Sequence, residues 1–217
     1  MPMRRRMVPV VIVGTVLAVA ATFLKIADSV RESDLVVRID RNTLELVLRN
    51  RVEWLSTAAR TVTLLGSGWT VLVVIAGSAT FLVLRHRCID ALFVAASATG
   101  TAIAVAIVKH AVGRPRPALP DRLVTATGAA FPSGHAAQSI ACYGALAVIA
   151  VTASRSNRTR AFVIAGAVAI ALAVGASRVY LGVHWLSDVV SGWLLAAGWL
   201  LALIGVRLAV DSPAEYR

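Results

Sequence analysis

Three short polar segments interrupt an otherwise apolar sequence, and each lies at the edge of a long hydrophobic run. The first is Lys-His-Ala-Val-Gly-Arg-Pro-Arg-Pro at 109–117, the second is Pro-Ser-Gly-His at 132–135, and the third extends from Ser177 to Asp188. Histidines, arginines, a lysine and a carboxylate are costly next to apolar helices and usually mark function there. We therefore interpret these segments as the part of the chain that carries chemistry.

His184 and Asp188 have the spacing of a histidine that is oriented by a carboxylate. Residues four apart lie one above the other on a helix, so Asp188 is predicted to accept the Nδ1 proton of the imidazole. This leaves the Nε2 lone pair of His184 facing outward and stabilises the charge that develops during an attack. A nucleophilic histidine needs this arrangement; the alternative is a pair that only fixes the start of a helix.

Ser133, Gly134 and His135 open the next predicted helix, where free backbone N–H groups and the helix dipole favour an anion. Ser133 is predicted to be both the N-cap and a phosphate ligand, and Gly134 to let the backbone approach closely. His135 follows in the first turn of this helix, where a lone histidine is more often structural.

Lys109, Arg116 and Arg178 supply positive charge without acidic neighbours in the sequence. Guanidinium groups match the oxygens of a phosphoryl group, so these residues predict a phosphate cradle. The stretch from the first motif to the last holds only two carboxylates, Asp121 and Asp188, which argues against two-metal hydrolysis. We expect no metal site and no cofactor.

The remaining charged residues and histidines near the three segments and in other loops are not assigned to the site. Arg114 and Arg122 are interpreted as surface charges or secondary substrate contacts, and His86 and His110 as surface residues. Asp34 and Asp40 have no recognisable ligand spacing.

The three segments resemble the signatures of the type 2 phosphatidic acid phosphatase (PAP2) family, Lys-x6-Arg-Pro, Pro-Ser-Gly-His and Ser-Arg-x5-His-x3-Asp, with no departure at a defining position. The resemblance implies a metal-independent membrane lipid phosphatase of the bacterial branch. It implies that His184, paired with Asp188, attacks phosphorus to form a phosphohistidine that water hydrolyses, and that His135 is the general acid. The residues implied to bind phosphate are Lys109, Arg116, Ser133, Gly134 and Arg178.

The rest of the chain reads as membrane helices that position these segments. The 217 residues are 58% hydrophobic and 15% charged, with a mean hydropathy of +0.78, and about 20 apolar residues suffice to span a bilayer. We predict one all-α domain over residues 1–217 with six spans. They are expected at 8–24, 61–84, 88–109, 136–154, 161–177 and 185–208.

The first span is predicted to be a retained anchor rather than a signal peptide, because its apolar run is long and no good cleavage site follows. Cys88 and Cys142 lie far apart in the sequence, at or inside predicted spans, and are interpreted as packing residues without a disulfide. The net charge of +11 is scattered over short loops. This distribution favours lipid head groups over nucleic acid as partners.

Six spans place all three polar segments on one membrane face. The tight connections 85–87 and 155–160 lie on the other face with the termini, and they hold arginines but no acid. The positive-inside rule therefore predicts cytoplasmic termini, including Arg4, Arg5 and Arg6, and an extracytoplasmic active site in the plasma membrane.

Residues 34–56 follow a different pattern from the spans. Leu44, Leu48 and Val52 recur at four-residue steps, with charged residues on another face. This predicts an amphipathic helix that lies either on the membrane surface or against the end of the helix bundle.

Several functions remain open at this stage. The chain could transfer phosphate to an acceptor other than water, or bind phospholipids without catalysis. A vanadate haloperoxidase would share the cradle, but such relatives are soluble; a transporter would need ionisable groups near mid-membrane. The expected partners are the bilayer and a lipid phosphate: polyprenyl diphosphate, which the bacterial-looking composition favours, phosphatidate or phosphatidylglycerophosphate.

Overall fold

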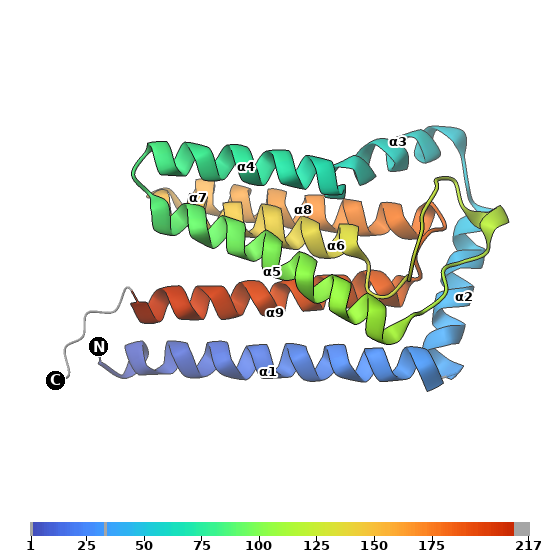
Figure 1. Cartoon of the computed structure of the whole chain (residues 1–217), viewed down its shortest axis with the longest axis horizontal. Coiled ribbons are helices and arrows are strands. Elements are labelled where there is room, and N and C mark those ends of the chain that lie inside the picture. The colour runs from blue at the N-terminus through green and yellow to red at the C-terminus, as the bar shows by residue number, and fades with distance from the viewer. Residues whose placement is uncertain (1, 33, 211–217) are drawn as a thin grey trace.

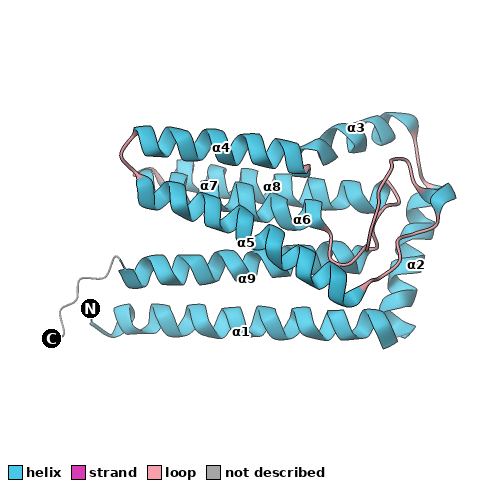
Figure 2. Ribbon diagram, viewed as in Figure 1, coloured by secondary structure: helices cyan, strands magenta, loops and turns pink. Residues whose placement is uncertain are grey.

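The structure, a computed structural model, describes residues 2–32 and 34–210, and side chains at 10–30 and 35–210. Every regular element in this part of the chain is helical (Figure 2), which confirms the predicted all-α class. Residue 1, residue 33, the C-terminal residues 211–217 and the side chains of Arg4 to Arg6 lie outside the described part. The main helices are α1 (Pro2–Glu32), α2 (Asp34–Arg49), α3 (Glu53–Thr63), α4 (Gly68–Leu84), α5 (Cys88–Val112), α6 (Gly134–Ser139), α7 (Ala145–Ala153), α8 (Asn157–Tyr180) and α9 (Leu186–Val210).

Five helical stretches are long and apolar enough to cross a membrane, and the bent pair α3–α4 makes up to six. They extend beyond most of the predicted limits, because polar and charged residues continue the helices past the apolar runs. The five are Val10–Val30, Cys88–Val112, Gly134–Ala153, Asn157–Tyr180 and Leu186–Val210.

The second predicted span, 61–84, is not one straight helix. The chain bends by 44° between Glu53–Gly66 and Gly68–Leu84, and Ser67 caps the new helix by accepting a hydrogen bond from the Thr70 N–H at 3.2 Å. A Cβ on Gly66 would lie 2.9 Å from the carbonyl oxygen of His135. The break therefore lets this segment pack directly against a signature residue.

A π-helical turn (η3, Ile140–Gly144) joins α6 to α7 within the fourth span. A π turn disturbs the regular backbone ladder, so a displaced carbonyl needs another donor. The Ser97 hydroxyl from α5 donates to Ala141 O at 2.8 Å, and both residues are buried. A polar side chain of a neighbouring helix thus satisfies the irregular backbone inside an apolar bundle.

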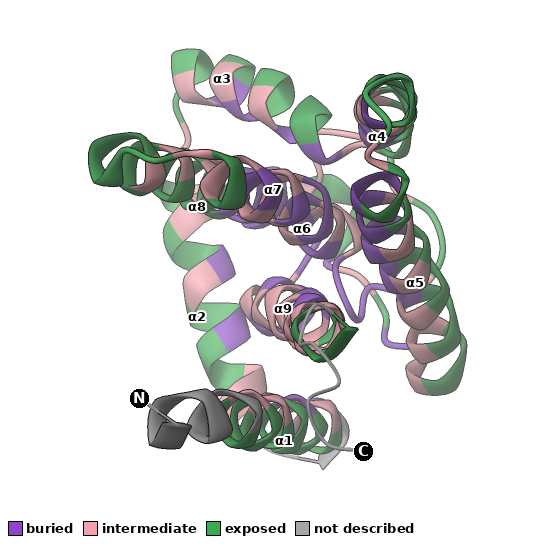
Figure 3. Ribbon diagram, turned by 90° about the vertical axis from the view of Figure 1, so that its left-hand side faces the viewer, coloured by how far each residue is buried: buried purple, intermediate pink, exposed green. Residues whose placement is uncertain are grey.

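The surface of the bundle is apolar, as a lipid-facing surface must be. The end view in Figure 3 shows buried positions directed between the helices and exposed positions on their outer sides. Large apolar residues are exposed there, including Trp69 at 79% and Phe162 at 82%. Cys142 is buried as predicted, whereas Cys88 is exposed, and both are free thiols.

Helix α2 crosses one end of the bundle (Figure 1). It ends at Arg49, so the predicted helix over 34–56 is too long, and α3 begins separately at Glu53. Of its apolar face, Leu44 is buried and Val47 packs against a cluster formed by α6, α8 and α9. The structure therefore favours the second alternative, a helix packed on the bundle end.

The two ends of the bundle differ in what they hold (Figure 1). The α4–α5 and α7–α8 connections lie at the same end as the start of α1 and the end of α9. The connection from α5 to α6 and the turn from α8 to α9 lie at the other end, beside α2. The polar segments therefore share one end, as the alternation of spans predicts.

Arg51 binds the loop between α5 and α6 to the end of α8. Its Nη2 donates to Asp121 O at 2.7 Å and to Tyr180 O at 2.8 Å. Gly182, with a φ of 70°, lies beside this contact, and a Cβ there would lie 2.2 Å from Asp121 O. Only glycine fits both the left-handed backbone and the close approach, so the turn before His184 is fixed against the loop.

Candidate active site at one end of the bundle

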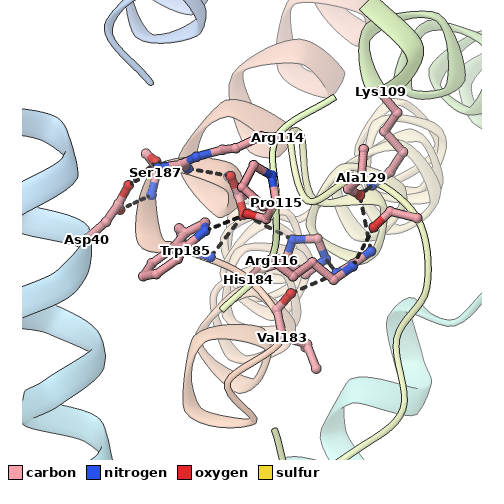
Figure 4. A network of polar contacts seen from close by, with 12 residues as sticks. Asp40, Lys109, Arg114, Pro115, Arg116, Ala129, Val183, His184, Trp185 and Ser187 are labelled. Carbon is pink, nitrogen blue, oxygen red and sulfur yellow. Dashed lines mark hydrogen bonds and ion pairs between the residues drawn. The ribbon is translucent and has the colours of Figure 1, made fainter. Parts of the chain in front are cut away.

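Figure 4 shows part of the site, with Lys109 and Arg116 of the first segment beside His184 of the third. Lys109 comes from the end of α5 and Arg116 from the loop that follows. His135 lies in the first turn of α6, and Arg178 lies near the end of α8. His184 lies in the turn between α8 and α9, so three helix ends and two connections contribute to one site.

His184 and Asp188 pair, but not as neighbours on one helix. Helix α9 begins at Leu186, so His184 precedes it, and its Nδ1 lies 3.3 Å from Asp188 Oδ2. The same oxygen accepts the Trp185 N–H at 2.9 Å. The Asp188 carboxylate, in the first turn of α9, thus accepts a hydrogen bond from a backbone N–H at the start of the helix and also pairs with the imidazole of His184. Both side chains are almost fully buried, at 2% and 0% exposure.

The tautomer of His184 follows from its second contact. Arg116 Nη1 lies 3.0 Å from His184 Nε2, and a guanidinium can only donate. Nε2 must therefore accept, which leaves Nδ1 to carry the proton and donate to Asp188. This is the tautomer that a nucleophilic Nε2 requires.

Burial keeps His184 neutral. Burial lowers the pKa of His184 to about 4, with Asp188 opposing the shift and Arg116 and Arg178 adding to it. A group with this pKa is deprotonated at neutral pH and holds its lone pair. The imidazole is therefore ready to attack without first losing a proton.

Arg116 is held by the protein on every nitrogen. Besides His184 Nε2, its guanidinium donates to four backbone carbonyls at 2.7–3.2 Å, those of Thr127, Gly128, Ala129 and Val183. Burial lowers the pKa of Arg116, and the charge of Asp188 opposes this shift. Arg116 thereby ties the connecting loop to the turn that carries His184.

Arg178 and Lys109 have fewer protein partners. Arg178 is 5% exposed, and its Nη1 donates to Thr63 Oγ1 from α3 at 2.8 Å. Its buried Nε finds no hydrogen-bond partner among the described residues. Lys109 Nζ donates to Ala129 O. These two cations keep donors for another acceptor.

His135 is half-buried and lies within electrostatic range of Arg178, His184, Arg116 and Lys109. The structure therefore gathers the two predicted histidines and the three predicted cations at one place. Their roles in a reaction remain predictions.

Ser133 is at the N-cap position of α6, but the predicted side-chain cap is wrong. Its hydroxyl is buried and has no partner in the described part of the chain, while its N–H donates to Asp188 O at 2.9 Å. A Cβ on Gly192 would lie 2.5 Å from Ser133 O. Backbone contact with the first turns of α9 therefore holds this segment. Gly134 has room, since a Cβ would meet only Val105 at 3.7 Å.

The interpretation of Arg114 as a surface charge is wrong. Arg114 is 8% exposed and lies between two carboxylates, with Nη2 2.7 Å from Asp40 Oδ2 and Nη1 2.6 Å from Asp188 Oδ1. Its charge is buried because both carboxylates neutralise it. Arg122 is half-buried, and its guanidinium donates to Pro117 O and Ala126 O within its own loop. His86 and His110 are exposed, as predicted.

Sequence reasoning missed Asp40, although a signal was available. On α2 the residue lies one turn before Leu44, on the face that packs on the bundle, yet an acid on that face needs a buried partner. Thr63, the partner of Arg178, carries no comparable signal. In the described residues no group of three or more histidine, cysteine or acidic side chains is arranged to hold a metal ion.

Comparison with known proteins identifies the family. The profile of the PAP2 superfamily matches residues 90–210, more than half of the chain. Phosphatidylglycerophosphatase B of Bacillus subtilis (strain 168) is 35% identical over 92 residues, which are 41% of this chain and 44% of that protein. The match to this curated relative thus spans less than half of its length.

Two solved structures share the fold. The transmembrane PAP2-type phosphatidylglycerolphosphate phosphatase from Bacillus subtilis superposes with a TM-score of 0.85 at 24% identity, covering 94% of this chain and 99% of that one. LpxE from Aquifex aeolicus gives a TM-score of 0.59 at 22% identity, covering 77% and 94%. With the profile match and the three signatures, these likenesses place the chain in the PAP2 superfamily.

Proposed function

We propose that the protein is a membrane lipid phosphatase that hydrolyses a lipid phosphate or diphosphate through a phosphohistidine. The observation that carries the proposal is His184. Its Nδ1 faces Asp188 at 3.3 Å and its Nε2 lies 3.0 Å from the cation of Arg116. A neutral imidazole oriented by a carboxylate, beside several cations, suits attack on a phosphorus atom.

The first step forms the phosphoenzyme. Nε2 of His184 attacks phosphorus while Arg116 Nη1 turns from Nε2 to a phosphoryl oxygen. The bond from the attacked phosphorus to the leaving oxygen breaks, and His135 gives its proton to that oxygen. The leaving oxygen is the lipid oxygen of a monophosphate or the bridging oxygen of a diphosphate. The incoming phosphate brings negative charge among the cations around His135, which favours the protonated imidazole needed for this transfer.

The second step releases phosphate. His135, now neutral, accepts a proton from water, and the water oxygen attacks the phosphohistidine. The bond between phosphorus and Nε2 breaks, which frees inorganic phosphate and neutral His184. Asp188 stabilises the imidazolium character of His184 in both steps.

Two buried donors support a phosphate position next to His184. The Nε of Arg178 and the hydroxyl of Ser133 lack partners among the described residues, and buried donors are seldom left unpaired. Both belong to the signature segments. A phosphoryl group has the oxygens that such donors need, with Lys109 contributing a further charge.

The substrate class follows from the position of the site. It lies at an end of a membrane bundle (Figure 1), where a lipid can keep its tail in the bilayer while its head group reaches the histidines. A relative is named for phosphatidylglycerophosphate. Polyprenyl diphosphate and phosphatidate meet the same requirement, and the composition of the chain inclines us toward the polyprenyl carrier.

The test is phosphate release by the purified protein in detergent from these three lipids, with and without EDTA. We expect release from at least one lipid, unchanged by the chelator. Activity that EDTA abolishes and a divalent ion restores would contradict the metal-free mechanism. Phosphate recovered on an added lipid alcohol instead of in solution would identify a phosphotransferase, and no turnover of any lipid would leave a binding protein.

The proposal places the active site on the extracytoplasmic face. Arginines of the α4–α5 and α7–α8 connections lie at the opposite end and favour the cytoplasm. Cys88 is exposed at that end and Cys142 is buried. A membrane-impermeant maleimide should therefore label Cys88 in broken cells but not in intact ones; labelling in intact cells would reverse the orientation.

A further inference from the structure

Asp40 is a buried carboxylate on a helix that contributes no signature residue. It is 2% exposed on α2, and its oxygens accept three hydrogen bonds (Figure 4). Arg114 Nη2 donates to Oδ2 at 2.7 Å, Ser187 Oγ to Oδ2 at 2.6 Å and Ser187 N to Oδ1 at 2.9 Å. Burial of a carboxylate is tolerated only with such compensation.

The contact with Ser187 fixes the beginning of α9. The Ser187 N–H belongs to the first turn, where backbone donors have no partner within the helix. Asp40 supplies the acceptor from another helix and puts negative charge at the positive end of α9. The first turn of α9, which also carries Asp188, is thereby attached to α2.

The contact with Arg114 fixes the orientation of a guanidinium. Because Asp40 engages Nη2, Arg114 presents Nη1 to Asp188 Oδ1, at 2.6 Å. The guanidinium carbon also lies 5.6 Å from the ring centre of Trp185. Asp188 Oδ2 is left for His184 Nδ1 and the Trp185 N–H.

We propose that Asp40 is a positioning residue for His184, acting through Arg114 and Asp188. Without Asp40, the guanidinium of Arg114 is free to bind both oxygens of Asp188, as arginine–carboxylate pairs commonly do. Arg114 then competes with the imidazole for Oδ2. Because its positive charge is no longer shared with Asp40, it also neutralises more of the negative charge of Asp188 that stabilises the imidazolium. This inference rests on the proposed phosphatase function, and it gives α2 a role in positioning the nucleophile.

The experiment compares Asp40→Asn with Glu45→Gln in the full-length protein. Both remove one negative charge from α2, but Glu45 is 61% exposed and forms an exposed ion pair with Arg49. We expect Asp40→Asn to lower kcat about 10- to 100-fold, as loss of a supporting contact behind a functional ligand does. KM should change less than about twofold, and Glu45→Gln should match the wild type.

A double-variant cycle separates positioning from a general structural role. If Asp40 acts by restraining Arg114, then Asp40→Asn should have little further effect on kcat in an Arg114→Gln background. Full additivity of the two effects would overturn the proposal. So would a kcat for Asp40→Asn equal to that of Glu45→Gln, or a change confined to KM.

A second variant covers the case in which Asp40→Asn does not fold. Ser187→Ala removes the hydroxyl that bridges Asp40 and Arg114 and should lower kcat several-fold; a wild-type kcat would overturn the inference. A wild-type protein that releases no phosphate from any lipid refutes the proposed function and this inference with it. An active wild type with an unaffected Asp40→Asn refutes the inference alone.

Discussion

Each end of the bundle holds a cluster of arginine and aspartate, and the two clusters differ in their balance of charge. At the end away from the motifs, Asp90 lies between two cations: Arg87 Nε is 2.6 Å from Oδ2, and Arg207 of α9 pairs with Oδ1. At the motif end the order is reversed, because Arg114 lies between Asp40 and Asp188.

The difference determines what each cluster can do. Both oxygens of Asp90 form ion pairs with arginines, so neither is left for another side chain. The cluster therefore links the start of α5 to the end of α9. At the motif end one cation is shared by two carboxylates, and Asp188 retains an oxygen for His184. A carboxylate saturated by cations joins helices, whereas one with an oxygen to spare can orient an imidazole.

The largest effect is expected from His184→Ala at the motif end. Loss of the nucleophile should lower kcat by roughly 10⁴-fold or more and abolish the trapped phosphohistidine, because the variant has no nitrogen in the place of Nε2. The measurement is phosphate release together with rapid trapping of phosphoenzyme. His110→Ala, which removes an exposed histidine at the same end, should match the wild type. Phosphoenzyme in His184→Ala would show that another residue is attacked.

Asp188→Asn should follow, with kcat lowered about 10³- to 10⁴-fold, because the amide cannot stabilise the imidazolium and can favour the wrong tautomer. The same substitution at the other end, Asp90→Asn, should leave kcat within about twofold. Equal losses of kcat in steady-state assays of the two folded variants would erase the distinction between the clusters.

The pH profile gives a smaller effect. With the pKa of His184 lowered to about 4, protonation removes the nucleophile only as pH falls through that value. At pH 5 about 90% of the imidazole is neutral, against about 3% for an ordinary histidine of pKa about 6.5, a difference of roughly 30-fold.

The measurement is kcat/KM from pH 3.5 to 7.5 with a phosphomonoester lipid and a diphosphate lipid. The phosphate ionisations of these substrates differ, so an acid limb common to both belongs to the enzyme. A common limb near pH 6.5 would contradict a buried, neutral His184.

The smallest effect on turnover and the clearest on stability is expected from Asp90→Asn. The variant leaves Arg87 and Arg207 without their shared carboxylate, and we expect a loss of about 2 kcal/mol, or roughly 4–8 °C in the unfolding temperature. Thermal unfolding in detergent measures it, with Glu45→Gln as the exposed-pair control. An unchanged midpoint would mean that the cluster does not hold α5 to α9.

Much of the architecture follows from local patterns. A bilayer requires apolar runs of about 20 residues, so the spans could be placed approximately from composition, and their alternation predicts one face for the three segments. The break at Gly66 and Ser67 escaped this reasoning. It depends on how closely His135 and Val174 approach the chain there, and hydropathy carries no such information.

The candidate site was predicted in its residues but not in its supports. His135, His184 and the cations could be selected because polar groups stand out against apolar helices. The prediction of a surface position for Arg114 was wrong because its partner Asp40 is 74 residues away. No residue near Arg114 in the sequence indicates a buried carboxylate. Thr63 reaches Arg178 over a still longer separation, 115 residues.

Hydropathy and spacing along the chain are enough to predict a membrane helix bundle and the residue types that gather at one of its ends. Which charges neutralise one another is fixed by the folded chain. Hydrogen bonds and ion pairs depend on distances in space, and a cation can be a surface group or a buried link between α2 and α9 with the same neighbours along the chain.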